Sequence, residues 1–117
     1  MISWNFVESV VSDFRTCIPI EGDRREWCVN KRAIAWERPL SKRDLEALGL
    51  NAPEGEVMAV HVSDLVSRNA WLEVDPDAFF VSKHFANYPA VLVDMSKANP
   101  DVVRELLVDT YEYLSAR

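Results

Sequence analysis

Residues 79–93 read FFVSKHFANYPAVLV, and this stretch decides the fold. Two apolar runs, rich in β-branched and aromatic side chains, flank a polar segment that ends in Tyr88 and Pro89. Such runs on either side of a turn-forming segment are typical of a β-hairpin. The sequence therefore predicts antiparallel strands over residues 78–84 and 90–95, joined by a turn.

A second hairpin and a further strand are predicted nearer the N-terminus. Residues 26–29 and 32–38 are short runs with the alternation of strands, and Asn30-Lys31 between them suits a tight reversal. Pro39 ends the second run, because proline has no backbone N–H to donate to a strand ladder. The apolar run at residues 57–62 is the remaining predicted strand.

Four segments carry the signals of helices. Each begins near a Ser or Asn that suits a helix N-terminus, and apolar residues follow at intervals of three and four. The second also has the pattern of a capping box, in which Ser41 and Asp44 exchange hydrogen bonds with each other's backbone N–H. The expected helices run from Ser3 to about Cys17, from Ser41 to Gly49, from Ser63 to Leu72, and from Asn99 to Leu114.

These elements predict an α+β fold in a single domain over residues 1–117. Consecutive strands joined by short turns favour an antiparallel sheet, since parallel neighbours need a crossover of about a dozen residues or more. We therefore expect a two-layer sandwich in which a five-stranded antiparallel sheet carries the helices on one face. The expected chain order is α-β(3)-α-β(2)-α.

Composition bounds the class of protein. The chain is 49% hydrophobic and 27% charged, as expected for a soluble globular domain. It has no apolar run of the roughly 20 residues that span a bilayer, and its N-terminus lacks the pattern of a signal peptide. We therefore expect a cytoplasmic protein with no membrane association. Cys17 and Cys28 have no metal-site spacing and are expected to be buried thiols, with a disulfide or metal pair as the lesser alternative.

The net charge of −6 hides a basic segment. Residues 24–43 contain seven basic and two acidic residues, a local charge of +5, whereas the remainder of the chain is acidic. DNA binding depends largely on phosphate neutralisation, so an acidic protein opposes it unless its basic residues converge on one face. Nucleic acid is therefore a possible partner that the net charge disfavours.

His84 and Tyr88 flank the turn of the predicted hairpin. A histidine there could act as a base or contact a ligand, because its ordinary pKa lies near neutrality. The sequence ties no nucleophile or paired carboxylate to it, so a structural role in the turn is the favoured interpretation. His61 follows an apolar strand without nearby acidic or thiol ligands, and no metal site is predicted.

Trp27 and Trp36 lie on the predicted first hairpin among arginines. By period-two alternation Arg32, Ile34, Trp36 and Arg38 share one face of the second strand. Arginines beside aromatic rings can stack on bases or hold a peptide or planar ligand. The favoured alternative is that both tryptophans pack in and beside the core, with the arginines as solvated neighbours.

No nucleotide-binding or catalytic pattern is present. The three glycines fall in neither a dinucleotide-binding nor a phosphate-binding loop, so no cofactor is expected. No set of residues fills the roles of nucleophile, base and oxyanion donor, and a non-catalytic protein is expected.

Residues 31–36, 75–80 and 84–93 also carry a family resemblance. Asp75-Pro76-Asp77-Ala78-Phe79-Phe80 and His84-Phe85 followed by Tyr88-Pro89-Ala90-Val91-Leu92-Val93 match the signature of the MmcQ/YjbR family of small bacterial proteins, which this chain resembles from Trp27 to Tyr111. The resemblance implies an α+β fold like that of secretion chaperones. Members of that family are often described as DNA-binding on the basis of fold analogy, so the resemblance also implies DNA binding as a possible function.

The sequence thus predicts a small cytoplasmic binding or interaction module whose partner is an unidentified protein or small molecule. The predicted site is the groove between the first hairpin and the turn at residues 84–88, with Trp36, Arg38, His84 and Tyr88 as candidate contacts. The alternative is a DNA-binding protein that uses the basic segment, with Arg24, Arg25, Lys31, Arg32, Lys42 and Arg43 as candidate contacts.

Overall fold

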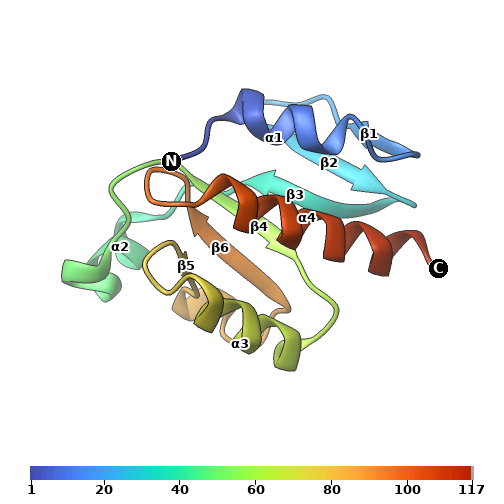
Figure 1. Cartoon of the computed structure of the whole chain (residues 1–117). Coiled ribbons are helices and arrows are strands. Elements are labelled where there is room, and N and C mark those ends of the chain that lie inside the picture. The colour runs from blue at the N-terminus through green and yellow to red at the C-terminus, as the bar shows by residue number, and fades with distance from the viewer. Residues whose placement is uncertain (117) are drawn as a thin grey trace.

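Six strands form one antiparallel sheet in the computed structural model, which describes residues 1–116 (Figure 1). The strand order across the sheet is β1-β2-β3-β4-β6-β5. The strands are β1 (Cys17–Pro19), β2 (Glu26–Val29), β3 (Arg32–Glu37), β4 (Val57–His61), β5 (Phe79–Phe80) and β6 (Ala90–Asp94). The helices are α1 (Trp4–Val11), α2 (Lys42–Leu48), α3 (Leu65–Val74) and α4 (Pro100–Ser115), with short 3₁₀ turns η1 (Gly49–Asn51) and η2 (Lys83–Phe85).

Three of the four helices cover one face of the sheet. Helix α4 lies across β2, β3 and β4, α1 packs beside α4, and α3 packs on β5 and β6 (Figure 1). The three long helices thus share one face as expected, whereas the short helix α2 packs against η2, away from that layer. No helix within residues 1–116 has both the length and the apolar character needed to span a membrane.

Strand β4 shows how the two faces of the sheet differ. Met58 and Val60 join the large core beneath the helices, whereas Val57 and Ala59 join a small cluster on the opposite face. This alternation is the period of a β-strand. The small cluster also contains Leu92, with Trp36, Leu40, Phe80 and Phe85 packed partly buried against it. The face opposite α1, α3 and α4 is called the open face below.

The sheet has six strands where the sequence predicted five, because the predicted first helix reached about Cys17 and no strand was predicted for Cys17–Pro19. Helix α1 begins at the predicted cap Ser3 but ends at Val11, and a turn leads into β1 with Thr16 at a φ of +65°. Phe14 continues the helical spacing of apolar residues, yet its ring stacks on Tyr111 from this turn. Its burial comes from tertiary packing and not from a longer helix.

The hairpin that decides the fold forms the expected pairing over a shorter length. Phe79 and Phe80 pair antiparallel with Val93 and Leu92, as predicted. The first strand ends at Phe80 and not at residue 84, because residues 82–88 leave the sheet in successive turns that include η2. The second strand, predicted over residues 90–95, is β6.

The hairpin of β2 and β3 is confirmed, with a β-bulge that the sequence did not reveal. Asn30 and Lys31 have φ angles of +51° and +67°, the left-handed geometry that tight hairpin turns favour. Trp27 pairs with Ala35, and Cys28 pairs with Ala33, which leaves Ile34 as the extra residue.

The bulge changes which face each side chain of β3 occupies. Ile34 and Ala35 both lie in the core beneath the helices, whereas Trp36 packs on the open face. The prediction that Arg32, Ile34, Trp36 and Arg38 share one face is therefore wrong. Trp36 and Arg38 stay together, and Ile34 turns the opposite way.

Helix caps are mostly as predicted. The capping box of α2 is present, and the Asn99 side chain accepts hydrogen bonds from the first backbone N–H groups of α4. The cap of α3 is Asp64 and not Ser63, since the Asp64 carboxylate accepts the Ser67 N–H at 2.7 Å. A charged acceptor is a strong N-cap, and Ser63 lies one residue too early to reach that donor.

We predict that Gly55→Ala destabilises the fold by about 1–3 kcal/mol. A Cβ atom at Gly55 would lie 2.7 Å from Cβ of Ser96 and 3.2 Å from its backbone nitrogen, so the chain must shift. Gly22→Ala is the matched control, since nothing lies within 4 Å of its Cβ position, and its effect should stay within about 0.5 kcal/mol. Urea unfolding of both variants measures this, and equal midpoints would contradict the close contact.

Candidate functional site

A row of rings runs from the open face to the end of β4. The Tyr88 ring meets Trp36 edge-on at 6.5 Å between centroids and stacks on Phe85 at 5.4 Å. On its other side Tyr88 meets the His61 ring at 6.1 Å, and His61 stacks on Tyr113 of α4 at 6.2 Å. These distances are those of favourable aromatic pairs. We call these five residues the aromatic row.

An arginine lies over each end of the aromatic row. The guanidinium carbon of Arg32 is 5.3 Å from the centre of the Tyr113 ring, and that of Arg38 is 5.1 Å from the centre of Phe85. Both distances fall within the range of cation–π contacts. Both arginines are half-buried, so the rings hold the two charges in defined places.

The four residues predicted to contact a ligand lie together. Trp36 and Arg38 come from the first hairpin, and His84 and Tyr88 come from the turn. Arg38, His84 and Tyr88 contact the Phe85 ring, and Trp36 contacts Tyr88. Tyr88 is 43% exposed, and His84 is exposed as well. The Tyr88 ring is therefore not buried in the corner of the hairpin. Trp27, by contrast, is buried beside Trp4 in the core beneath the helices.

Arg68, to which no sequence pattern pointed, fixes the turn that carries Tyr88. This α3 residue is only 9% exposed, and its Nη1 donates to the carbonyls of Phe85, Ala86 and Tyr88 at 3.2, 2.8 and 3.4 Å. Its Nε and Nη2 donate to the side-chain oxygen of Asn69. These hydrogen bonds could not be predicted from the sequence, because the partners of Arg68 in the turn are backbone atoms.

His61 is a neutral, partly buried member of the row. Burial and the nearby Arg32 charge lower its pKa below the ordinary value of 6.5. Its Nδ1 is buried and has no hydrogen-bond partner among the described residues, while its carbonyl accepts the Thr110 hydroxyl at 2.6 Å. An uncharged imidazole fits between the Tyr88 and Tyr113 rings, where a second charge beside Arg32 would be unfavourable.

A basic hollow adjoins the Phe85 end of the row. It encloses about 610 Å³ between α2 and η2. Its single carboxylate, Asp44, already accepts the Ser41 N–H at 3.3 Å in the capping box. The side chains around this basic hollow are Arg38, Ser41, Arg43, Asp44, Ala47, Lys83 and His84.

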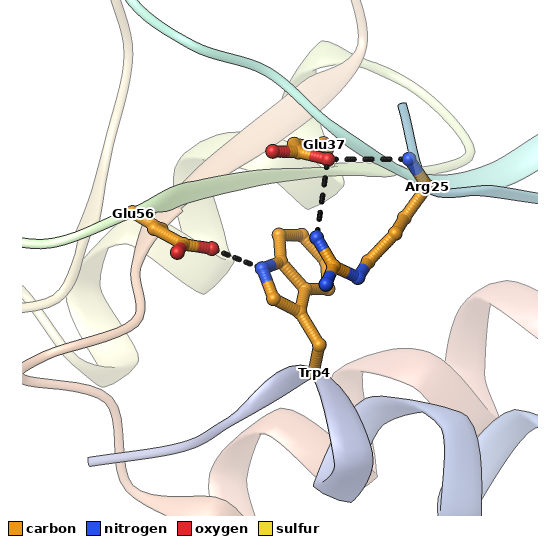
Figure 2. A network of polar contacts seen from close by, with 4 residues as sticks. All are labelled: Trp4, Arg25, Glu37 and Glu56. Carbon is orange, nitrogen blue, oxygen red and sulfur yellow. Dashed lines mark hydrogen bonds and ion pairs between the residues drawn. The ribbon is translucent and has the colours of Figure 1, made fainter. Parts of the chain in front are cut away.

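Arg25, a candidate for nucleic-acid contact, is engaged by intramolecular contacts. Figure 2 shows its guanidinium stacked over Trp4, at 5.2 Å from the ring centre, and paired with the Glu37 carboxylate at 3.5 Å. The same carboxylate accepts the backbone N–H of Arg25 at 3.2 Å, and the Trp4 indole N–H donates to Glu56 (Figure 2). The network joins α1 to the sheet, which is a structural use of this arginine.

The other basic candidates do not form one face. Lys31 and Arg32 lie at the turn between β2 and β3, while Lys42 and Arg43 lie on α2 beyond the far end of β3. A strand of this length separates its ends by roughly 20 Å. Arg24 borders a different and larger hollow of about 1040 Å³ beside α1. That hollow is acidic, because its lining includes Glu8, Glu21, Asp23, Glu26 and Glu37 against Arg24 and Arg25.

Neither cysteine is an activated nucleophile. Cys17 and Cys28 are free thiols, and burial together with the neighbouring Cys28 raises the pKa of Cys17 to about 11. Burial and Glu26 raise the pKa of Cys28 as well. Thiolate is the reactive form, so both groups are weak nucleophiles at neutral pH. Within the described part of the chain no three His, Cys, Asp or Glu residues are grouped to hold a metal ion.

Three mycobacterial proteins are similar to this chain over nearly its full length. They are the uncharacterized proteins Mb2600 of Mycobacterium bovis and MT2646 and Rv2570 of two strains of Mycobacterium tuberculosis. Each is 33% identical over 116 residues, which cover 95% of this chain and 87% of the relative. The chain belongs to the same family as these proteins. No protein-family model matches the chain, and no solved structure matches it.

We predict that Arg68→Met destabilises the fold by about 2–4 kcal/mol. Methionine keeps the length of the side chain but removes the three donations to the turn carbonyls. The Phe85 and Tyr88 carbonyls still accept the backbone N–H groups of Tyr88 and Ala90, so the Ala86 carbonyl is the most affected. Arg104→Met is the control, because Arg104 is exposed and its ion pair with Asp101 lies at the surface. Denaturant unfolding measures both effects. An Arg68→Met variant as stable as the control would disprove that the hydrogen bonds of Arg68 to the turn carbonyls stabilise the fold.

We predict that His61 makes the protein less stable as the pH falls below about 6.5. The unfolded chain takes up a proton on His61 at that pH, whereas the folded chain resists it because the His61 pKa is lowered. Protonation thus favours the unfolded state, and stability is lost as the pH falls from the unfolded pKa toward the folded one. His61→Phe keeps a ring in the row and should flatten the stability profile between pH 7.5 and 5.5, measured by thermal unfolding. Parallel profiles for the two proteins would contradict this assignment.

Proposed function

We propose that this protein is a non-catalytic binding module of the MmcQ/YjbR type that holds a planar group on its open face. The observation that carries the proposal is the contact of Tyr88 with both Trp36 and Phe85, with Arg38 over the Phe85 ring. These side chains come from two segments far apart in the sequence, and none of the three helices of the other layer covers them.

The composition of this site resembles that of binding surfaces. Tryptophan, tyrosine and arginine contribute most often to the energy of protein interfaces, because they bury large areas at low entropic cost and keep a polar end. Tyr88 exposes nearly half of its surface although three other rings surround it. Stacking a planar group on these rings removes that exposed surface from water, which supports a binding role.

A non-catalytic role is supported by the surroundings of the reactive groups. His84 contacts the ring of Phe85, and no serine, cysteine or carboxylate hydrogen-bonds to its imidazole within residues 1–116. Ser82 is buried, and its hydroxyl has no hydrogen-bond partner in the described structure. A nucleophile needs an adjacent base or a lowered pKa, and both thiols have raised pKa values instead.

DNA binding receives less support from the distribution of charge. The basic residues of segment 24–43 lie at both ends of β3, and Arg25 is engaged by Glu37. We therefore expect duplex DNA to bind at ~150 mM salt more weakly than the ~10⁻⁴–10⁻⁶ M usual for non-specific DNA binding. Fluorescence anisotropy tests this, and micromolar binding with a steep salt dependence would favour the alternative function.

The indole N–H signals of the four tryptophans provide a direct test of the binding site. We predict that adenosine and indole, added at roughly millimolar concentration, shift the NMR signal of Trp36 and leave that of Trp71 unchanged. Trp71 is a control within the same molecule, since it packs partly buried on Phe79 against the core of the opposite face, away from the aromatic row.

Substitutions then assign the shift to the aromatic row. Tyr88→Ala should abolish the shift of Trp36, whereas Tyr111→Ala should preserve it, because Tyr111 stacks on Phe14 outside the row. If Trp71 shifts as much as Trp36, or if Tyr88→Ala binds like the unchanged protein, the proposed site is wrong.

A further inference from the structure

We propose that the basic hollow between α2 and η2 is an anion site, so that the ligand of the open face is a small planar molecule with a phosphate or carboxylate group. This inference rests on the proposed function and adds the chemical class of the ligand.

The basic hollow and the aromatic row share a wall. Arg38 lines the hollow while its guanidinium carbon lies 5.1 Å from the centre of the Phe85 ring. His84 also lines the hollow, and its ring lies 5.6 Å from Phe85. A ring stacked against Phe85 and Tyr88 therefore brings a short substituent to the mouth of the hollow. One ligand can use both surfaces at once.

The charge of the hollow selects an anion. Arg38, Arg43 and Lys83 supply three positive charges against the single carboxylate of Asp44, in a chain whose net charge is −6. Neither Arg43 nor Lys83 has an ion-pair partner among the residues that the structure describes. Arg38 donates from Nη1 to the carbonyl of Pro39 at 2.8 Å, which holds its guanidinium beside the hollow. Arginine presents several N–H donors in a geometry that suits phosphate and carboxylate oxygens.

The size of the hollow favours a small molecule over a polymer. Its volume of about 610 Å³ lies within the range of small-molecule sites, roughly 300–1,000 Å³. Double-stranded nucleic acid presents phosphates over a long track, but Lys31 and Arg32 lie at the other end of β3. The large hollow beside α1 does not compete for an anion, because its lining is acidic.

The test compares four probes on the full chain: AMP and phenyl phosphate, which join a ring to a phosphate, and adenosine and inorganic phosphate, which each supply one part. NMR titrations follow the Trp36 indole signal and the backbone signals of residues 83–88. We expect AMP and phenyl phosphate to bind about tenfold more tightly than adenosine or phosphate alone.

A matched pair of double variants locates the anion site. Arg43→Ala with Lys83→Ala removes two charges from the hollow and should weaken AMP about tenfold while leaving adenosine unchanged. Arg24→Ala with Lys31→Ala removes the same charge elsewhere and should change AMP affinity by less than about twofold.

The outcomes separate this inference from the proposed function. If both double variants weaken AMP equally, or if AMP binds no more tightly than adenosine, the anion site is wrong, and the proposed function stands as long as Tyr88→Ala abolishes adenosine binding. If AMP depends on Arg43 and Lys83 while adenosine causes no shift, the anion site stands and ring binding on the open face is wrong. If no probe shifts any signal at about 10 mM, both are wrong.

Discussion

The candidate site depends on one buried interaction, the clamp of Arg68 on the carbonyls of the turn at residues 85–88. A guanidinium taken out of water is costly unless its donors are satisfied, and here every nitrogen of the group donates to an oxygen. The turn itself satisfies these carbonyls only in part, since the Phe85 and Tyr88 carbonyls also accept the backbone N–H groups of Tyr88 and Ala90 and Arg68 supplies the further donations. The Arg68 hydrogen bonds therefore stabilise an irregular turn from the side of its backbone, while the Phe85 and Tyr88 rings stack on each other.

The fixed turn brings together aromatic and basic side chains that lie far apart in the sequence. Tyr88 meets Trp36 of β3 and His61 of β4, while Phe85 receives Arg38 from the end of β3. The low pKa of His61 keeps its ring neutral, so the positive charge stays at the two ends of the row. Rings in the middle and cations at the ends form a surface suited to a planar ligand with a negative group.

Much of the fold could be predicted from the sequence because local signals are strong. Continuous apolar runs predicted β4 and β6, Asn30 and Lys31 predicted the turn between β2 and β3, and Asn99 predicted the start of α4. The misses have tertiary causes. Strand β1 is three residues long and is stabilised by its pairing with β2, and the bulge at Ile34 leaves no local mark in the sequence.

The candidate site could be predicted only in part. Trp36, Arg38, His84 and Tyr88 drew attention through their residue types and their place beside a turn. Arg68 could not be found, since its partners in the turn are backbone carbonyls 17 to 20 residues along the chain. The separation in space of the basic residues of segment 24–43 could not be predicted either. A charge count along the sequence does not show that strand β3 places these residues at its two ends.

Intermolecular nuclear Overhauser effects between AMP and the protein locate the bound ligand. If a planar anion binds on the open face, contacts run from the adenine protons to the rings of Trp36, Phe85 and Tyr88. Contacts to Trp4 and Trp27 would place the ligand on the opposite face, in the acidic hollow beside α1, and would contradict the account.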